Sequence, residues 1–117
     1  MNRLLAILIL IFSTLPVHAS LNCRGEYLDT KGKGPTGELA LLEENSERAI
    51  YQADINNWKY RAEWQKTSGA LKLLIYFNNV NAPSLYTSTV APAKDLPVYS
   101  FSLLFGYKLG IACEAGT

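Results

Sequence analysis

The two cysteines constrain this chain more than any other feature, because they stand near its two ends, at positions 23 and 113. In an exported protein, two such cysteines most simply form one intramolecular disulfide. An intermolecular bridge and two free thiols are the alternatives. A disulfide requires Cα atoms within about 7 Å of each other. The pair therefore predicts that the first and last strands of the fold lie side by side.

Residues 1–19 have the features of a cleaved secretory signal peptide. A basic start with Arg3 precedes an apolar run over residues 4–12, and a small-x-small motif ends at Ala19. The apolar run is shorter than the roughly 20 residues that a bilayer-spanning helix needs, which disfavours a permanent membrane anchor. We expect cleavage near Ala19, a single domain over residues 20–117, and a secreted or periplasmic location in a bacterial envelope.

Cleavage limits the chemistry of the mature chain, because the leader contains Arg3 and the only histidine, His18. Ten Lys and Arg residues then balance ten Asp and Glu residues. This balance does not favour nucleic acid or anionic lipid as a partner. The absence of histidine excludes the common catalytic triads and histidine-containing zinc sites, and a disulfide consumes both thiols. We therefore expect no enzymatic activity, no metal and no cofactor.

Turn-forming residues recur at short intervals, and the segments between them are rich in Val, Ile, Tyr, Trp, Phe and Thr. This spacing is typical of an all-β sandwich or barrel rather than of βαβ units. Together with the expected disulfide, it predicts a small antiparallel meander that closes into a seven- or eight-stranded barrel. An orthogonal β-sandwich is the alternative.

A hairpin with a two-residue turn at residues 56–57 explains the middle of the chain, because Asn-Asn tolerates the backbone conformation of such a turn. Its register sets Ala53 opposite Tyr60 and Ala49 opposite Trp64, a small residue against a large one each time. Cross-strand pairs of this kind fix the register. The aromatic residues of this hairpin are therefore predicted to belong to the core, and Trp58, next to the turn, is the one expected to reach the surface.

Two further turns would extend the same apolar face, one at residues 68–69 and one at residues 45–46. The second also sets Glu44 against Glu47, which makes its register less favourable. The pairs that these two turns predict are Leu73 with Trp64, Ile75 with Ala62, and Leu42 with Ala49.

Every odd position from residue 99 to residue 113 is apolar. A single strand of this length would exceed the usual range, so the segment is either bent at Gly106 and Gly110 or folded as a hairpin through residues 106–108. A three-residue loop keeps the odd positions on one face. Both alternatives place these side chains on the core side with Cys113, and they differ only in the strand number.

The predicted register turns an apolar patch outward and surrounds it with charged side chains. Contiguous apolar patches of this kind mark protein-binding surfaces. Coverage by residues 79–97, or by another copy of the chain, is the alternative. The residues of this predicted patch are Leu41, Ile50, Arg61, Glu63, Leu74 and Tyr76.

These features favour a non-catalytic binding or inhibitor-type domain with a protein partner or self-association. The expected shape resembles that of small periplasmic lysozyme inhibitors, but their Ser-Gly-x-x-Tyr motif is not present, since Lys72 stands where the tyrosine would follow residues 68–69. A small-ligand or carbohydrate-binding barrel is the second hypothesis, and it requires a cavity or an exposed aromatic platform. A minimal hydrolase is the third, and it needs two facing carboxylates.

Overall fold

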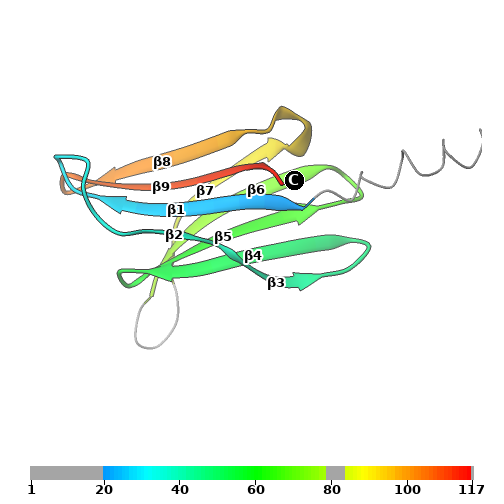
Figure 1. The fold of residues 1–117 in the computed structure, drawn as a ribbon, viewed down its shortest axis with the longest axis horizontal. Coiled ribbons are helices and arrows are strands. Elements are labelled where there is room, and N and C mark those ends of the chain that lie inside the picture. The colour runs from blue at the N-terminus through cyan, green and yellow to red at the C-terminus, as the bar shows by residue number, and fades with distance from the viewer. Residues whose placement is uncertain (1–19, 79–83, 117) are drawn as a thin grey trace, which may run out of the picture.

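The computed structural model describes residues 20–78 and 84–116, so the predicted signal peptide lies outside the described residues. Within those ranges the chain forms nine β-strands and one short 3-10 helix, η2 (Ala93–Asp95) (Figure 1). The strands are β1 (Leu21–Leu28), β2 (Thr36–Glu38), β3 (Ala40–Glu44), β4 (Arg48–Ile55), β5 (Trp58–Gln65), β6 (Ala70–Phe77), β7 (Ser84–Pro92), β8 (Val98–Leu104) and β9 (Tyr107–Ala115).

The strands form two antiparallel sheets whose inner faces share one core. Sheet A has the order β2-β1-β9-β8, and sheet B has the order β3-β4-β5-β6-β7. The prediction of an all-β antiparallel fold is confirmed. The prediction of a closed barrel with seven or eight strands is wrong, because no ladder joins the two sheets among the described residues, and a two-sheet sandwich fits this arrangement.

The chain crosses between the sheets where regular pairing is interrupted. Leu39 separates β2 from β3 and is buried, so the short β2 stays with sheet A while β3 joins sheet B. Pro92 and Pro97 flank the second crossing, from β7 to β8, and proline has no N–H to donate to a ladder. These interruptions leave the two sheets separate instead of continuing one sheet around a barrel.

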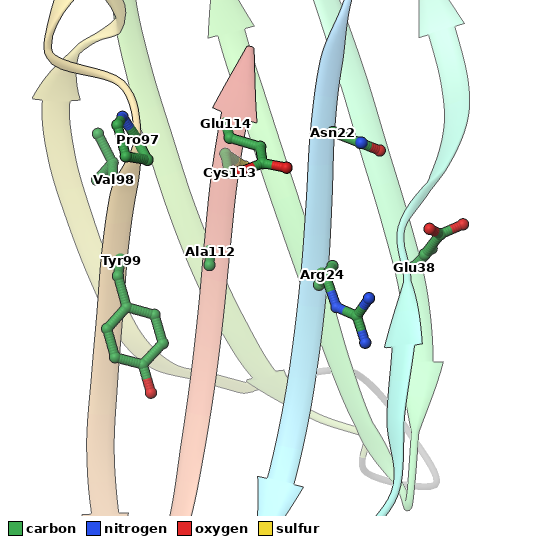
Figure 2. Close-up of a pocket in the computed structure, with 9 residues that line it drawn as sticks. All are labelled: Asn22, Arg24, Glu38, Pro97, Val98, Tyr99, Ala112, Cys113 and Glu114. Atoms are coloured by element: carbon green, nitrogen blue, oxygen red, sulfur yellow. The ribbon is translucent and has the colours of Figure 1, made fainter. Parts of the chain in front are cut away.

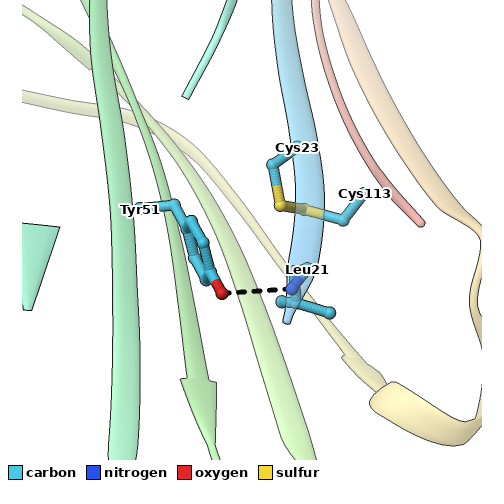
Figure 3. Close-up of a disulfide and its surroundings, with 4 residues drawn as sticks. All are labelled: Leu21, Cys23, Tyr51 and Cys113. Atoms are coloured by element: carbon cyan, nitrogen blue, oxygen red, sulfur yellow. Dashed lines mark hydrogen bonds between the residues drawn. A yellow bond between two sulfur atoms is a disulfide. The ribbon is translucent and has the colours of Figure 1, made fainter. Parts of the chain in front are cut away.

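The disulfide between Cys23 and Cys113 is present, and it lies inside the sheet rather than at a loop (Figure 3). The two residues face each other in the β1–β9 pair with Cα atoms 4.1 Å apart. Each is only 1% exposed. Beside it the Leu21 amide donates a hydrogen bond of 3.0 Å to the Tyr51 hydroxyl of sheet B. The prediction that the first and last strands are neighbours is confirmed.

The hairpin at residues 56–57 has the predicted register, with Ala53 opposite Tyr60 and Ala49 opposite Trp64. Its two turn residues adopt φ angles of 51° and 69°, the conformation that a two-residue turn requires. Tyr60 is fully buried, so its predicted place in the core is confirmed.

The registers of the other two central hairpins differ from prediction. The turn after β5 has four residues, 66–69, so Ile75 faces Tyr60 instead of Ala62. A shift of two residues keeps every side chain on its predicted face. The β3–β4 register is irregular between Leu41 and Glu43, and Glu44 instead of Leu42 faces Ala49. In the turn between β3 and β4, the Asn45 side chain accepts hydrogen bonds from the backbone amides of Glu47 and Arg48, which stabilises a turn longer than two residues.

Trp58 does not reach the surface, and the corresponding prediction is wrong. Its side chain is 7% exposed, because it lies opposite Phe77 in the β5–β6 pair and beside Tyr86 of β7. The ring centroid of Phe77 is 5.0 Å from that of Trp58, and the ring centroid of Tyr86 is 5.2 Å from it. Aromatic pairs at these separations pack favourably, so three rings pack together at the end of the hairpin.

The β8–β9 hairpin turns at Phe105 and Gly106, both with positive φ, and not through residues 106–108. A two-residue turn sets odd residues of β8 opposite even residues of β9. The predicted core face is therefore correct for β9, where Leu109 and Ile111 are buried. It is wrong for β8, whose odd side chains point away from the core.

Candidate functional site

The predicted binding patch on the outer face of sheet B is not an exposed apolar surface. Ile50 is only 2% exposed and Leu74 only 7%. Ile50 lies opposite Glu63, and Leu74 lies opposite Arg61. The Arg61 side chain donates to Glu63 Oε2 at 2.6 Å and to the Gln52 side chain at 3.2 Å. Long side chains that are hydrogen-bonded to each other in this way cover the aliphatic groups between them. The alternation of residues along a strand does not reveal such coverage.

The remaining residues of the predicted patch keep some exposure. Leu41 on β3 is 51% exposed, but it pairs with the core residue Tyr51 and therefore lies on the inner side of sheet B, so its predicted place on the outer face is wrong. Arg61, Glu63 and Tyr76 are half-buried. Their role in binding a partner stays a prediction, but they no longer surround a contiguous apolar centre.

The outer face of sheet A instead exposes a row of large apolar side chains on β8. Tyr99 is 48% exposed, Phe101 is 54% exposed and Leu103 is 68% exposed. They alternate along the strand with half-buried residues that face the core. Phe105, in the turn that follows, is 94% exposed. We call Tyr99, Phe101 and Leu103 the β8 apolar row.

A shallow groove of about 190 Å³ runs beside this row across the four strands of sheet A (Figure 2). The pairing places Tyr99 of β8, Ala112 of β9, Arg24 of β1 and Glu38 of β2 in one line across the sheet. Because Ala112 is small, it forms a low floor between the tyrosine and the arginine. The groove therefore presents an aromatic side chain on one wall, and a cation and a carboxylate on the other.

The next line across the sheet explains how Tyr99 is held. Its hydroxyl donates to Glu26 Oε1 at 2.5 Å, and Lys108 Nζ lies 3.6 Å from the same carboxylate oxygen. This contact passes over Gly110, where an added Cβ would lie 2.6 Å from Glu26 Oε1 and 2.9 Å from the Tyr99 hydroxyl. A residue with a side chain at position 110 would thus displace the tyrosine. Lys108 Nζ also lies 5.6 Å from the ring centroids of Tyr99 and Phe101.

This contact network perturbs two titrating groups. Burial, followed by the hydrogen bond to Glu26, raises the pKa of Tyr99 above its ordinary value. Interaction with the Tyr99 hydroxyl, with a smaller contribution from Glu26, raises the pKa of Lys108. Lys108 therefore stays a cation and Tyr99 a neutral hydrogen-bond donor at physiological pH.

The groove offers binding chemistry: an aromatic face, a guanidinium, and carboxylates from Glu38 and Glu114. In residues 20–78 and 84–116 there is no free cysteine, and no three potential ligands gather as they would around a metal ion. The same ranges contain no helix of the length and hydropathy that a membrane span requires.

The sequence did contain one signal for this surface, although its meaning depends on the turn. The alternation from residue 98 to residue 104 shows a regular strand, but either of its faces could be the inner one. The type of turn decides, and Phe-Gly is not among the dipeptides that indicate a two-residue hairpin turn. The small residues Ser100 and Ser102 are the inner ones, and they meet Thr89 and Tyr86 of β7 through hydrogen bonds.

No known protein family, no curated protein and no solved structure matches this chain.

The raised tyrosine pKa values predict that the domain loses stability in alkali. Burial is also the main cause of the raised pKa of Tyr60. A tyrosine with a raised folded-state pKa stabilises the fold in full below its unfolded pKa of about 10, and this stability is lost as the pH rises through the folded pKa. We expect urea unfolding between about pH 8 and 11 to show a falling free energy of unfolding, with a smaller fall in Tyr60→Phe. Equal falls in the two proteins would contradict this expectation.

Proposed function

We propose that this protein is a non-catalytic binding domain of a bacterial envelope or exterior, and that it binds a protein partner through the outer face of sheet A. The β8 apolar row is the observation that carries this proposal. Three large apolar side chains lie along one strand, and each is about half exposed or more. Solvent-exposed apolar patches rimmed by charge are typical of interaction sites, and aromatic residues are enriched at the centres of interfaces.

The surroundings of the row support a specific interaction. Arg24, Glu26, Glu38 and Lys108 lie on the strands to one side of it and place both signs of charge beside it. Mixed charge at the rim of an apolar patch orients a partner and disfavours partners with the wrong charge pattern. The buried disulfide agrees with an oxidising compartment, which supports the predicted export.

A carbohydrate ligand is the second candidate, and one observation favours it. Tyr99 and Phe101 are stacked with ring centroids 5.6 Å apart, and the groove beside them contains an arginine and carboxylates. An exposed aromatic platform with adjacent hydrogen-bonding groups suits the apolar and polar faces of a sugar.

A capture experiment from an envelope extract tests the proposal and separates the two candidates. The wild type is compared with a variant that carries Tyr99→Ser, Phe101→Ser and Leu103→Ser. The matched control carries Leu85→Ser and Val90→Ser, which removes exposed apolar groups from β7 of the other sheet. We expect the first variant to lose at least about tenfold in recovery of the partner, as for hot-spot residues, and the control to retain it.

Equal recovery by the wild type and the β8 variant would overturn the proposal. Treating the extract with protease decides the class of ligand, because a protein partner is destroyed whereas a polysaccharide survives. Retained binding after protease treatment would favour the carbohydrate candidate, and circular dichroism of each variant shows that the fold is intact.

A further inference from the structure

The four edge strands of the two sheets differ in how they are protected against pairing with another chain. Natural edges are protected by short length, charge, proline or a bulge. On this basis β2 is short, with three residues; β3 carries Glu43 and Glu44 and an irregular register; and β7 ends at Pro92 and is irregular near Tyr86. Of the edges that the structure describes, β8 alone has none of these devices. It has seven residues, no charge and no proline, and it pairs regularly with β9.

The hydrogen-bonding groups of β8 that face away from β9 can be assigned from the pairing. A two-residue turn makes its flanking pair, Leu104 and Tyr107, a hydrogen-bonded pair. Alternation then directs the N–H and C=O groups of the β8 apolar row toward the free edge. The Cα atoms of Cys23 and Cys113 are 4.1 Å apart, which is typical of a non-hydrogen-bonded pair. The N–H and C=O groups of Cys113 therefore point away from β1 and toward β8, in agreement with this assignment.

One group on this edge already has a partner. The Leu103 carbonyl accepts a hydrogen bond from the Tyr86 hydroxyl at 3.2 Å. A carbonyl oxygen has two lone pairs, so it can accept a second bond. The other outward groups of the row have no partner in the ladder of sheet A.

The sequence of β8 is self-complementary for antiparallel pairing. From either end, residues 98–104 give two apolar residues, a serine, a phenylalanine, a serine and two apolar residues. If two copies pair about Phe101, that residue faces its own equivalent, Tyr99 faces Leu103 and Ser100 faces Ser102. A two-fold interface requires a surface that is complementary to itself, and this strand has that property.

We propose that two copies of this chain pair through their β8 strands, antiparallel and centred on Phe101, so that the two sheets A form one continuous sheet. The pairing satisfies the outward backbone groups of Tyr99, Phe101 and Leu103 in both copies. Because these side chains project from the face of the sheet and not from its edge, the two β8 apolar rows lie side by side and remain open to a partner. The inference goes beyond the proposed function and does not depend on it.

Phe101 is the residue at which a substitution separates pairing from folding. Phe101→Lys places two like charges opposite each other on the two-fold axis, which is destabilising for a directly opposed pair. Phe101→Glu does the same with the opposite sign. Phe105→Lys makes the same chemical change four residues away, in the exposed turn outside the paired segment, and is the matched control.

Sedimentation of the protein purified after export, between about 10 μM and 1 mM, tests the proposal. We expect the wild type and Phe105→Lys to dimerise, and Phe101→Lys and Phe101→Glu each to dimerise at least about tenfold more weakly. An equimolar mixture of the two Phe101 variants should form a heterodimer. A monomeric wild type over this range, a Phe101→Lys variant that dimerises like the wild type, or a mixture that stays monomeric would each overturn it.

Hydrogen exchange of the wild type tests the same pairing without any substitution. The amides of the β8 apolar row should gain protection as the protein concentration rises, while the amides of Ser100 and Ser102 are already protected by β9. Row amides whose exchange does not depend on concentration would overturn the proposal. Both measurements use purified protein without a partner, so a failed capture experiment leaves them unaffected.

Discussion

Replacing Cys23 and Cys113 together with alanine is expected to lower the free energy of unfolding by about 4 kcal/mol. The bond joins residues 90 positions apart, and closing so long a loop removes much conformational entropy from the unfolded chain. Since domains of this size are stable by only about 5–15 kcal/mol, the loss is a large share of the total. Urea denaturation followed by tryptophan fluorescence measures it.

The control for this experiment is Ser20→Ala, which changes a side chain next to the same strand pair and leaves the bond intact. We expect it to unfold at nearly the wild-type urea concentration. A double cysteine variant within about 1 kcal/mol of the wild type would show that strand pairing and core packing alone hold β1 against β9.

Tyr60→Ala is expected to destabilise the fold by about 3–5 kcal/mol, as for other large aromatic residues removed from a core. Tyr60 is fully buried, and its hydroxyl donates to the Glu26 carbonyl at 2.8 Å, so the substitution leaves a cavity and an unpaired acceptor. Tyr60→Phe separates the two effects, because it removes only the hydrogen bond, worth about 1 kcal/mol. Thermal and urea unfolding of the three proteins give the values.

Gly25 supplies an independent check on this packing, because an added Cβ would lie 2.8 Å from the Tyr60 ring. Gly25→Ala should therefore destabilise the wild type and cost less in the Tyr60→Ala background, a coupling that a double-mutant cycle measures. Additive effects of the two substitutions would contradict direct packing of the ring on the glycine.

The sequence predicted the parts of this fold that depend on local pairing. The Asn56-Asn57 hairpin has its predicted register because small and large residues alternate across it and two asparagines suit its turn. The disulfide and its neighbouring strands were also predictable, since a covalent bond limits the possible topologies. The β5–β6 pair kept its faces but shifted by two residues, because a four-residue loop replaces the predicted turn.

The candidate site could not be predicted, because it depends on which face of β8 is inward. Alternation gives two faces without saying which is buried, and the unusual Phe-Gly turn sets the answer. The expected exposure of Ile50 and Leu74 in the predicted patch was wrong for a different reason. Ile50 and Leu74 do point outward, yet the Arg61–Glu63 pair and its neighbours on the central strands bury them.

The position of the disulfide also determines how the domain responds to a mechanical load. Ser20 and Gly116 lie at the same end of the β1–β9 pair, joined by a backbone hydrogen bond of 2.7 Å. A force that pulls these two residues apart would unzip only the first pairs of the ladder before it reaches the covalent bond at Cys23 and Cys113. Beyond that point the tension passes through the disulfide bond, so the part of the chain between Cys23 and Cys113 in the sequence carries none of it. A domain held in this way can be tethered or pulled at both ends while its sheets keep their shape.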